Sequence, residues 1–246
     1  MAETMYERIG AEYVAARRTD ARIGQAIIAA IGDARSVLNV GAGTGSYEPT
    51  DRAVVAVEPS VEMIRCRPAS GAPVVRATAE ALPFRDGSFD AALAVLTLHH
   101  WADWRAGVSE LKRVARRAIV LTSDAEVFAR YWLNDEYFPE IVELDRGRFP
   151  TIGQLSKALR ATKVQAVRVP RDCTDGFAGA HWARPETYLD ASARLAMSVF
   201  AALPDQVISK GIARLRADLE NGAWEQRHGA LRRAEDFDVG LRLVIA

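Results

Sequence analysis

Short apolar runs separated by polar or glycine-containing segments dominate the first half of the chain. They lie at residues 36–40, 54–57, 74–77, 89–98 and 118–122. Between them, apolar residues recur at helical spacing, as at 103–116 with Trp104 and Leu111 on one face. Runs of this length that alternate with helices predict a parallel sheet with helices on both faces.

The pattern changes in the second half. Residues 125–163 are predicted to be helical and aromatic, and 164–169 to form a sixth strand. A long helical stretch at 171–237 follows, and a seventh strand is expected at 239–245. At the other end, residues 6–31 are predicted to be helical with an interruption at 17–20. No segment resembles a linker, so we expect one α/β domain.

Composition excludes several classes of protein. The 246 residues are 49% apolar and 26% charged, and Lys plus Arg equals Asp plus Glu at 32 each. This balance favours neither nucleic acid nor an anionic membrane as the partner. No apolar run reaches the roughly 18 residues of a membrane span, and no signal peptide is recognised. Cys66 and Cys173 are expected to be reduced thiols in a cytoplasmic protein.

Residues 37–45, Val-Leu-Asn-Val-Gly-Ala-Gly-Thr-Gly, end an apolar run in three alternate glycines. Such a loop lets a ligand lie against its backbone at the carboxyl edge of a sheet. A dinucleotide would need a helix opening directly from the loop to hold its pyrophosphate. Only residues 46–53, including Pro49, precede the next strand, which leaves about two helical turns at most. A phosphate-free cofactor, S-adenosylmethionine, fits better.

Three strand ends supply the other groups that this cofactor needs. Glu58 follows the second strand, where a carboxylate can accept both ribose hydroxyls. Met63, one turn later, can cover an adenine face or pack in the core. Residues 78–80, Thr-Ala-Glu, follow the third strand, where backbone and polar groups can read the adenine edge.

Four motifs together resemble those of the class I S-adenosylmethionine-dependent methyltransferases. They are the glycine motif, Val-Ala-Val-Glu-Pro-Ser at 55–60, Ala-Glu-Ala-Leu-Pro-Phe at 79–84 and Ser-Phe-Asp-Ala-Ala-Leu at 88–93. The small-molecule branch with the ubiquinone/menaquinone-type enzymes is the most similar. The resemblance implies a Rossmann-like seven-stranded sheet of order 3-2-1-4-5-7-6, with strand 7 antiparallel and a helical insertion or lid. It divides the single domain into N-terminal capping helices at 1–33, a cofactor-binding core at 36–124, and substrate-side segments at 125–163 and 171–237.

The resemblance also implies which residues contact the cofactor. Gly41, Ala42 and Gly43 would lie against its methionine part, and Glu58 would hold the ribose with Pro59, Ser60 and Met63 nearby. Thr78, Ala79 and Glu80 would surround the adenine, with the Ala79 N–H directed to it, and Leu96 and Thr97 would flank the cofactor. The chain departs from the family at Asn39 and Thr78, each in place of an Asp, and in its short first crossover. Tyr13 and Arg17 could close this open side, with Arg17 meeting the cofactor carboxylate, or belong to an ordinary helix surface.

Methyl transfer needs a general base only when the acceptor does not lose its proton unaided. His99 and His100 end the fourth strand, and His100 is the better base candidate, although the pair could equally serve packing. The aromatic residues at 128–149, Phe128 and Phe149 among them, are candidates for the walls of a substrate pocket, or belong to an amphipathic helix that packs on the sheet. The specific substrate-binding candidates are Tyr131, Trp132, Phe138, His181 and Trp182. Acidic residues at 135, 136, 140, 143 and 145 are expected to form a solvated face. The four histidines and two cysteines show no metal-ligand spacing, so no metal is expected.

The sequence therefore predicts methyl transfer from S-adenosylmethionine to a small organic molecule. One alternative is a non-catalytic, regulatory protein that binds the same cofactor on the same fold. The other, a nicotinamide-dependent oxidoreductase, is disfavoured by the short crossover.

Overall fold

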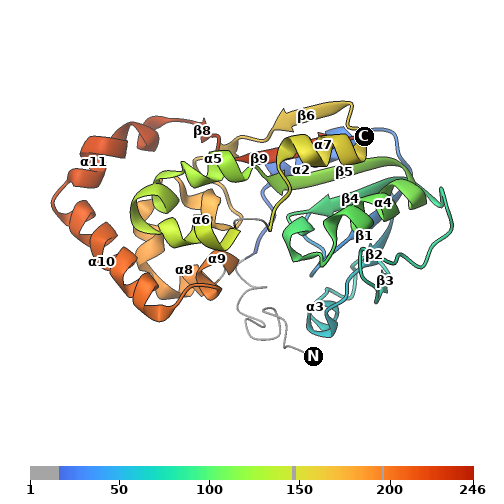
Figure 1. Ribbon diagram of the computed structural model, residues 1–246, viewed down its shortest axis with the longest axis horizontal. Coiled ribbons are helices and arrows are strands. Elements are labelled where there is room, and N and C mark those ends of the chain that lie inside the picture. Colours follow the sequence, from blue (N-terminus) through green and yellow to red (C-terminus); the bar gives the residue numbers. More distant parts are fainter. Residues whose placement is uncertain (1–16, 146–147, 196) are drawn as a thin grey trace.

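The computed structural model describes residues 17–145, 148–195 and 197–246. Figure 1 shows two halves side by side, a sheet flanked by helices and a group of helices built from residues after 124. We refer to them as the sheet half and the helical half. The chain passes from the sheet half to the helical half, returns to the sheet at residues 152–166, enters the helical half again and ends in the last strand of the sheet.

Seven strands form the main sheet, in the order β3-β2-β1-β4-β5-β9-β6. Their bounds are β1 Ser36–Val40, β2 Ala53–Val57, β3 Val74–Val75, β4 Phe89–Val95, β5 Ala115–Ser123, β6 Lys163–Ala166 and β9 Leu241–Ile245. The first five are parallel, whereas β9 runs antiparallel to both β5 and β6. In chain order this is 3-2-1-4-5-7-6 with the last strand reversed, so the predicted topology is confirmed.

Alternate residues of the strands build two separate cores, because successive side chains of a strand point to opposite faces. Val37, Leu93 and Leu121 pack on one face with helix α2 (Ala21–Ile31). Leu38 and Val120 pack on the other with α4 (Trp104–Val114) and α7 (Ile152–Leu159). Helix α3 (Val61–Arg65) follows β2 and begins at Ser60, whose side chain accepts from the Met63 N–H as a predicted cap.

The helical half joins the core on the α2 face. Its segments are α5 Ala125–Ala129, the π-helical turn η2 Leu133–Tyr137, α6 Pro139–Asp145, α8 Ala191–Leu195, α9 Ser198–Ala201, α10 Asp205–Glu220 and α11 Ala223–His228. Short 3-10 turns complete it, namely η3 Ala178–His181, η4 Pro185–Leu189 and η5 Gly229–Arg233. Buried aromatic side chains of these segments, Trp182 and Trp224 among them, form one continuous cluster with Leu121 and Leu243 of the sheet.

Four predicted strands are shorter than expected, two of them only at one end, where β3 stops at Val75 instead of residue 77 and β9 begins at Leu241 instead of residue 239. The apolar run 164–169 splits, because β6 ends at Ala166 and β7 (Val169–Pro170) pairs instead with β8 (Asp236–Phe237) in a separate two-stranded sheet. The run 89–98 ends as a strand at Val95, because Leu96 adopts a left-handed backbone with φ 50°. The 3-10 turn η1 (Leu98–His100) follows it. Between β1 and β2 the chain forms only turns, as the short crossover predicts.

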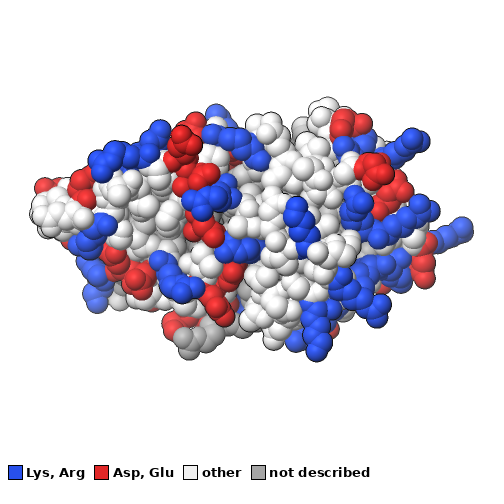
Figure 2. All heavy atoms as spheres, turned by 90° about the horizontal axis from the view of Figure 1, so that it is seen from above, with Lys and Arg blue, Asp and Glu red and all other residues white. Residues whose placement is uncertain are grey.

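The surface is charged on both halves. On the face shown in Figure 2, basic and acidic side chains mix over the helical half, and basic ones predominate over the sheet half. Within the described ranges, no helix has the length and apolar character that crossing a membrane requires.

Candidate active site

The glycine loop leaves β1 in a conformation that only glycine adopts without strain. Gly41 has φ 69° and Gly43 has φ 52°, both in the left-handed region. A Cβ placed on Gly41 would lie 2.8 Å from the Thr97 Cβ, so a side chain there would collide with the end of β4. A Cβ on Gly43 would meet nothing within 4 Å. The loop therefore packs against β4 on one side and faces open space on the other, as a backbone shelf for a ligand would.

Glu58 lies directly beside this shelf. Its side chain is buried, and one carboxylate oxygen accepts the Gly43 N–H at 2.7 Å while the other accepts the Ser60 N–H at 2.9 Å. Burial raises the pKa of Glu58, and the two N–H donors partly offset that rise. Each oxygen keeps further acceptor capacity, which suits a pair of vicinal hydroxyls such as those of a ribose.

A buried ion pair between Arg67 and Glu48 supports the glycine loop. The Arg67 guanidinium donates to both oxygens of Glu48 at 2.8 Å and to the Gly43 carbonyl at 3.1 Å. The two side chains are only 4% and 10% exposed. The Asn39 amide donates to Glu48 at 3.1 Å, while its carbonyl oxygen is buried with no hydrogen-bond partner among the described residues. Arg67, from the segment after α3, thus supports a loop that has no crossover helix behind it. Sequence reasoning missed it, because nothing local links Arg67 to a loop 24 residues away.

The end of β4 forms the wall of the site that faces the helical half. A branched residue rarely has a positive φ, and Leu96 does so directly at the carboxyl edge, where strained residues often mark functional sites. His99 stacks on Phe149 with ring centroids 4.7 Å apart, and its ring centroid lies 3.8 Å from that of His100. Burial, with the nearby Arg148 charge, lowers the pKa of both histidines, that of His100 to about 4. Both are neutral at physiological pH but are weak proton acceptors.

A cavity of about 100 Å³ opens between this wall and the helical half. Apolar and aromatic side chains form most of its wall, and a few polar groups interrupt it. The lining residues are Arg17, Leu96, His99, Ser123, Phe128, Asp145, Phe149, Phe177, Ala178, Gly179, Ser198, Val199, Val239 and Leu241. We call this space the acceptor cavity. Pockets of this kind, apolar with few polar groups, are typical of small-molecule sites.

The specific residues predicted for substrate binding lie outside the acceptor cavity. Tyr131, Trp132, Phe138 and Trp182 are 0–4% exposed and belong to the core of the helical half. Their polar atoms bond within that core, as in the Trp132 Nε1 donation to the Trp182 carbonyl at 2.9 Å. His181 does not line the acceptor cavity either.

Two other aromatics of the segment 128–149, Phe128 and Phe149, do line the cavity, as the broader prediction for that segment expects. Phe177, which was not predicted, completes the phenylalanine wall.

Arg17, predicted as one possible contact of the cofactor carboxylate, pairs with a carboxylate of the chain itself. Its guanidinium pairs with Asp175 at 2.7 Å, and the same carboxylate accepts from the Tyr47 hydroxyl at 2.8 Å. Tyr47 belongs to the glycine loop region and has φ 63°. Asp175 therefore joins the N-terminal segment, the loop and the helical half, and Arg17 lines the acceptor cavity. Tyr13 lies outside the described residues.

The remaining predicted cofactor contacts lie at the carboxyl edge of the sheet. Ser60, Met63, Ala79 and Thr97 are buried, and Ala42 is buried in the glycine loop. Thr78 and Pro59 are exposed, and Glu80 accepts from the Asp103 N–H at 3.2 Å, which ties the segment after β3 to α4. The edge thus combines buried apolar positions with exposed backbone, as an adenine slot requires.

Together the fold and the edge define a Rossmann-like α/β protein with a site suited to an adenosine-bearing cofactor. The comparisons agree. The family model described as a methyltransferase domain matches residues 38–120. A structure from Anabaena variabilis, described as a candidate methyltransferase from an antibiotic biosynthesis pathway, is 32% identical. It has a TM-score of 0.83, and the match covers 92% of this chain and 97% of that one.

One further relative is a methyltransferase, and a more distant structure shares the fold. An uncharacterized methyltransferase of Bacillus subtilis, YcgJ, is 32% identical over 120 residues, which are 44% of this chain and 44% of the relative. The match therefore spans less than half the length of that relative. Geranyl diphosphate C-methyltransferase of Streptomyces coelicolor, solved with S-adenosyl-L-homocysteine, shares the fold at 12% identity and a TM-score of 0.52, covering 92% of this chain and 76% of that one. The chain belongs to the class I S-adenosylmethionine-dependent methyltransferases.

Proposed function

We propose that the protein transfers the methyl group of S-adenosylmethionine to a small organic molecule held in the acceptor cavity. The observation that carries this proposal is the position of the cavity. It lies between the end of β4, which packs on the glycine loop, and a phenylalanine-lined wall of the helical half. The Anabaena relative's assignment to an antibiotic biosynthesis pathway also fits a small acceptor.

On the cofactor side, the glycine loop and Glu58 would do most of the binding. Glu58 would accept the ribose hydroxyls, the loop backbone would contact the methionine part, and Met63 and the Ala79 backbone would contact the adenine. This cofactor, when bound, supplies a methyl group on a positively charged sulfur, which is the electrophile. The open space beside Gly43 and the buried carboxylate of Glu58 fit such a group.

On the acceptor side, the chain aligns the nucleophile and excludes water. The helical segments 125–163 and 171–237 would close the cavity, and we infer that they form one domain with the sheet half because the two halves share a core. The similarity to the ubiquinone/menaquinone-type branch stays a prediction, since no relative reported above is specific to it.

The test is methyl transfer to separated cell fractions. The protein is incubated with S-adenosylmethionine carrying a labelled methyl group and with low-molecular-mass, RNA or protein fractions of an extract. We expect label in low-molecular-mass products only. Gly41→Val, whose side chain would collide with Thr97, should give none. Label in RNA or protein would contradict the proposal.

Calorimetry checks the cofactor separately. S-adenosylhomocysteine should bind with micromolar or tighter affinity, whereas NAD should not bind measurably. Binding of NAD without binding of S-adenosylhomocysteine would overturn the assignment of the site.

A further inference from the structure

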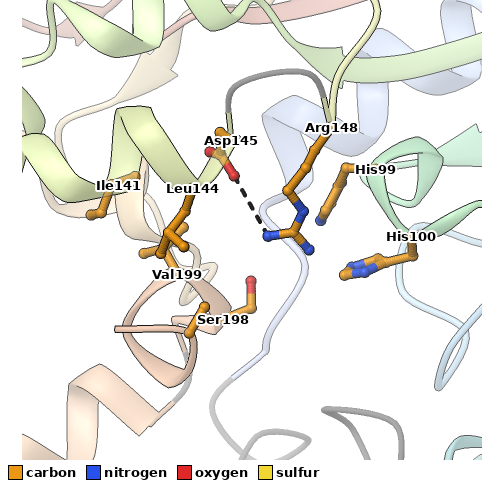
Figure 3. A pocket seen from close by; sticks show the side chains of 9 residues that line it. His99, His100, Ile141, Leu144, Asp145, Arg148, Ser198 and Val199 are labelled. Carbon is orange, nitrogen blue, oxygen red and sulfur yellow. Dashed lines mark ion pairs between the residues drawn. The ribbon is translucent and has the colours of Figure 1, made fainter. Parts of the chain in front are cut away.

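A carboxylate that the sequence assigned to a solvated face lines the acceptor cavity. Asp145, the last residue of α6, lines this cavity and also a smaller one of about 30 Å³. The two cavities share His99, Asp145, Ser198 and Val199, so they are adjacent. Figure 3 shows the Arg148 guanidinium between Asp145 and the two histidines.

The carboxylate of Asp145 is enclosed but has spare capacity to accept hydrogen bonds. Its side chain is 16% exposed, and its ion pair with Arg148 spans 3.8 Å, which is longer than a hydrogen bond. Among the described residues, no side chain donates a hydrogen bond to it. Burial raises its pKa to about 6, against a smaller opposing effect of Arg148. At neutral pH it is ionised and can accept a proton with little penalty.

The histidines are poorer proton acceptors at the same place. Their pKa values are lowered by burial and by Arg148, so protonating either one beside that cation is unfavourable. A group that works as a base near neutral pH has a pKa near that pH. The expectation that His100 is the base is therefore replaced by one centred on Asp145.

We propose that Asp145 binds and deprotonates the acceptor, and that this acceptor is a small aromatic molecule with a phenolic hydroxyl. The inference rests on the proposed function. The phenyl groups of Phe128, Phe149 and Phe177 suit a flat apolar body. The charged residues of the cavity wall are Asp145 and Arg17; Arg17 is paired with Asp175, and Arg148 adjoins Asp145 from the smaller cavity. Arg148 favours an oxygen that becomes negative and disfavours an ammonium group.

The proton and the electrons balance without a further reactant. An oxygen of Asp145 takes the phenolic proton, and a lone pair of the phenolic oxygen forms the new bond to the methyl carbon. The carbon–sulfur bond breaks and its electron pair stays on sulfur, which becomes a neutral thioether. The products are an aryl methyl ether and S-adenosylhomocysteine, and the proton on Asp145 passes to water.

The test uses 4-nitrophenol, whose visible absorption reports its ionisation, with the full chain and S-adenosylhomocysteine present. At a pH slightly above the pKa of the free phenol, the probe bound to wild type should keep the neutral-phenol spectrum, because its hydroxyl donates to the Asp145 carboxylate and a second negative charge beside that carboxylate is unfavourable. Asp145→Asn, which leaves Arg148 as the nearby charge, should bind the probe as the phenolate. Glu140→Gln, which changes an exposed carboxylate on the same helix, should behave as wild type.

Affinity and turnover supply independent readouts. Wild type should bind phenol about tenfold more tightly than anisole, which has no proton to donate, and Asp145→Leu should lose this preference. With S-adenosylmethionine and a panel of phenols, Asp145→Asn should lower kcat at least tenfold with little change in KM. An unchanged spectrum, preference and kcat in the variants, or methylation of anilines or of ring carbon instead of phenols, would overturn the inference.

The same samples separate this inference from the proposed function. If S-adenosylhomocysteine binds wild type and Asp145→Asn equally, both are folded and the cofactor site is correct, so a negative probe result counts against Asp145 alone. If S-adenosylhomocysteine does not bind wild type, the proposed function itself fails.

Discussion

The two halves of the molecule build their walls of the site by different means. On the sheet half, the wall is formed by the backbone of the glycine loop. Gly41 packs against Thr97, and Arg67, which belongs to a buried ion pair, donates to the Gly43 carbonyl. On the helical half, the wall is made of side chains, and a second layer of buried aromatics lies behind it. A backbone wall suits a ligand that never changes, whereas a side-chain wall can be altered without loss of the fold.

Among substitutions that distinguish the two halves, one at Arg67 is expected to have the largest effect on stability and cofactor binding. Removing one partner of a buried ion pair leaves an uncompensated charge, so Arg67→Ala should destabilise the protein by about 3–5 kcal/mol and weaken S-adenosylhomocysteine binding. Arg65→Ala is the matched control, because Arg65 is 70% exposed and should change stability by less than about 0.5 kcal/mol. Denaturant unfolding and calorimetry measure both. Equal, small effects would show that the loop does not depend on this pair.

A comparable loss of stability, but with cofactor binding preserved, is expected at Trp182. This side chain is fully buried and donates to the Val169 carbonyl at 2.9 Å, so Trp182→Ala should cost about 3–5 kcal/mol. Phe177→Ala, on the cavity wall, should cost less and alter the KM for the acceptor. A stable Trp182→Ala protein with an altered acceptor KM would restore the substrate role that the sequence predicts for Trp182.

A substitution at Glu58 tests the cofactor-binding side of the site directly, and its expected free-energy effect is smaller. Glu58→Ala should weaken S-adenosylhomocysteine binding by about 1.5–3 kcal/mol, the range for hydrogen bonds to a charged group, which is roughly ten- to hundredfold in Kd. Glu62→Ala, which removes a 44% exposed carboxylate from the adjacent helix, should leave the Kd unchanged. An unaltered Kd in the Glu58 variant would contradict the ribose assignment.

The smallest expected effect, per pH unit, is a pH dependence of stability that arises in the helical half. Burial lowers the pKa of His181 to about 4, whereas in the unfolded chain it takes up a proton near pH 6.5. Between these values the unfolded state binds more protons, so stability falls as the pH falls, by at most about 1.4 kcal/mol per pH unit from this group. His181→Gln should make the curve less steep between pH 6.5 and 4, where His99 and His100 still contribute, and run parallel to wild type above pH 7.5. Parallel curves throughout would contradict the assignment.

The sheet half was largely readable from the sequence because its signals are local. Alternation, strand length and the glycine motif predict β1, β2, β4 and the carboxyl edge of the sheet as the cofactor site. Ser60, as a cap residue, predicts the start of α3. The order of the last two strands came from the family resemblance and is confirmed. Arg67 was not predicted, since its contact with the loop exists only after the chain has folded back.

The helical half was readable only as helical and aromatic. Periodicity separates apolar from polar faces, but it does not distinguish a phenylalanine on a cavity wall from a tryptophan one layer deeper. Phe128 and Tyr131 are three residues apart, yet Phe128 lines the cavity and Tyr131 is 2% exposed in the core. Asp145 looked like the other acidic residues of its segment, and its burial depends on His99, Arg148 and Ser198, which come from three separate segments.

The position of β9 between β5 and β6 has a consequence for synthesis of the chain. At roughly 5–20 residues per second, the ribosome takes several seconds to make the segment between β6 and β9. Throughout that time β5 is an open edge of a parallel sheet, with unpaired backbone groups and apolar side chains next to it. The nascent protein should therefore depend on chaperone protection, and a translational pause within residues 167–240 should lower the yield of soluble protein.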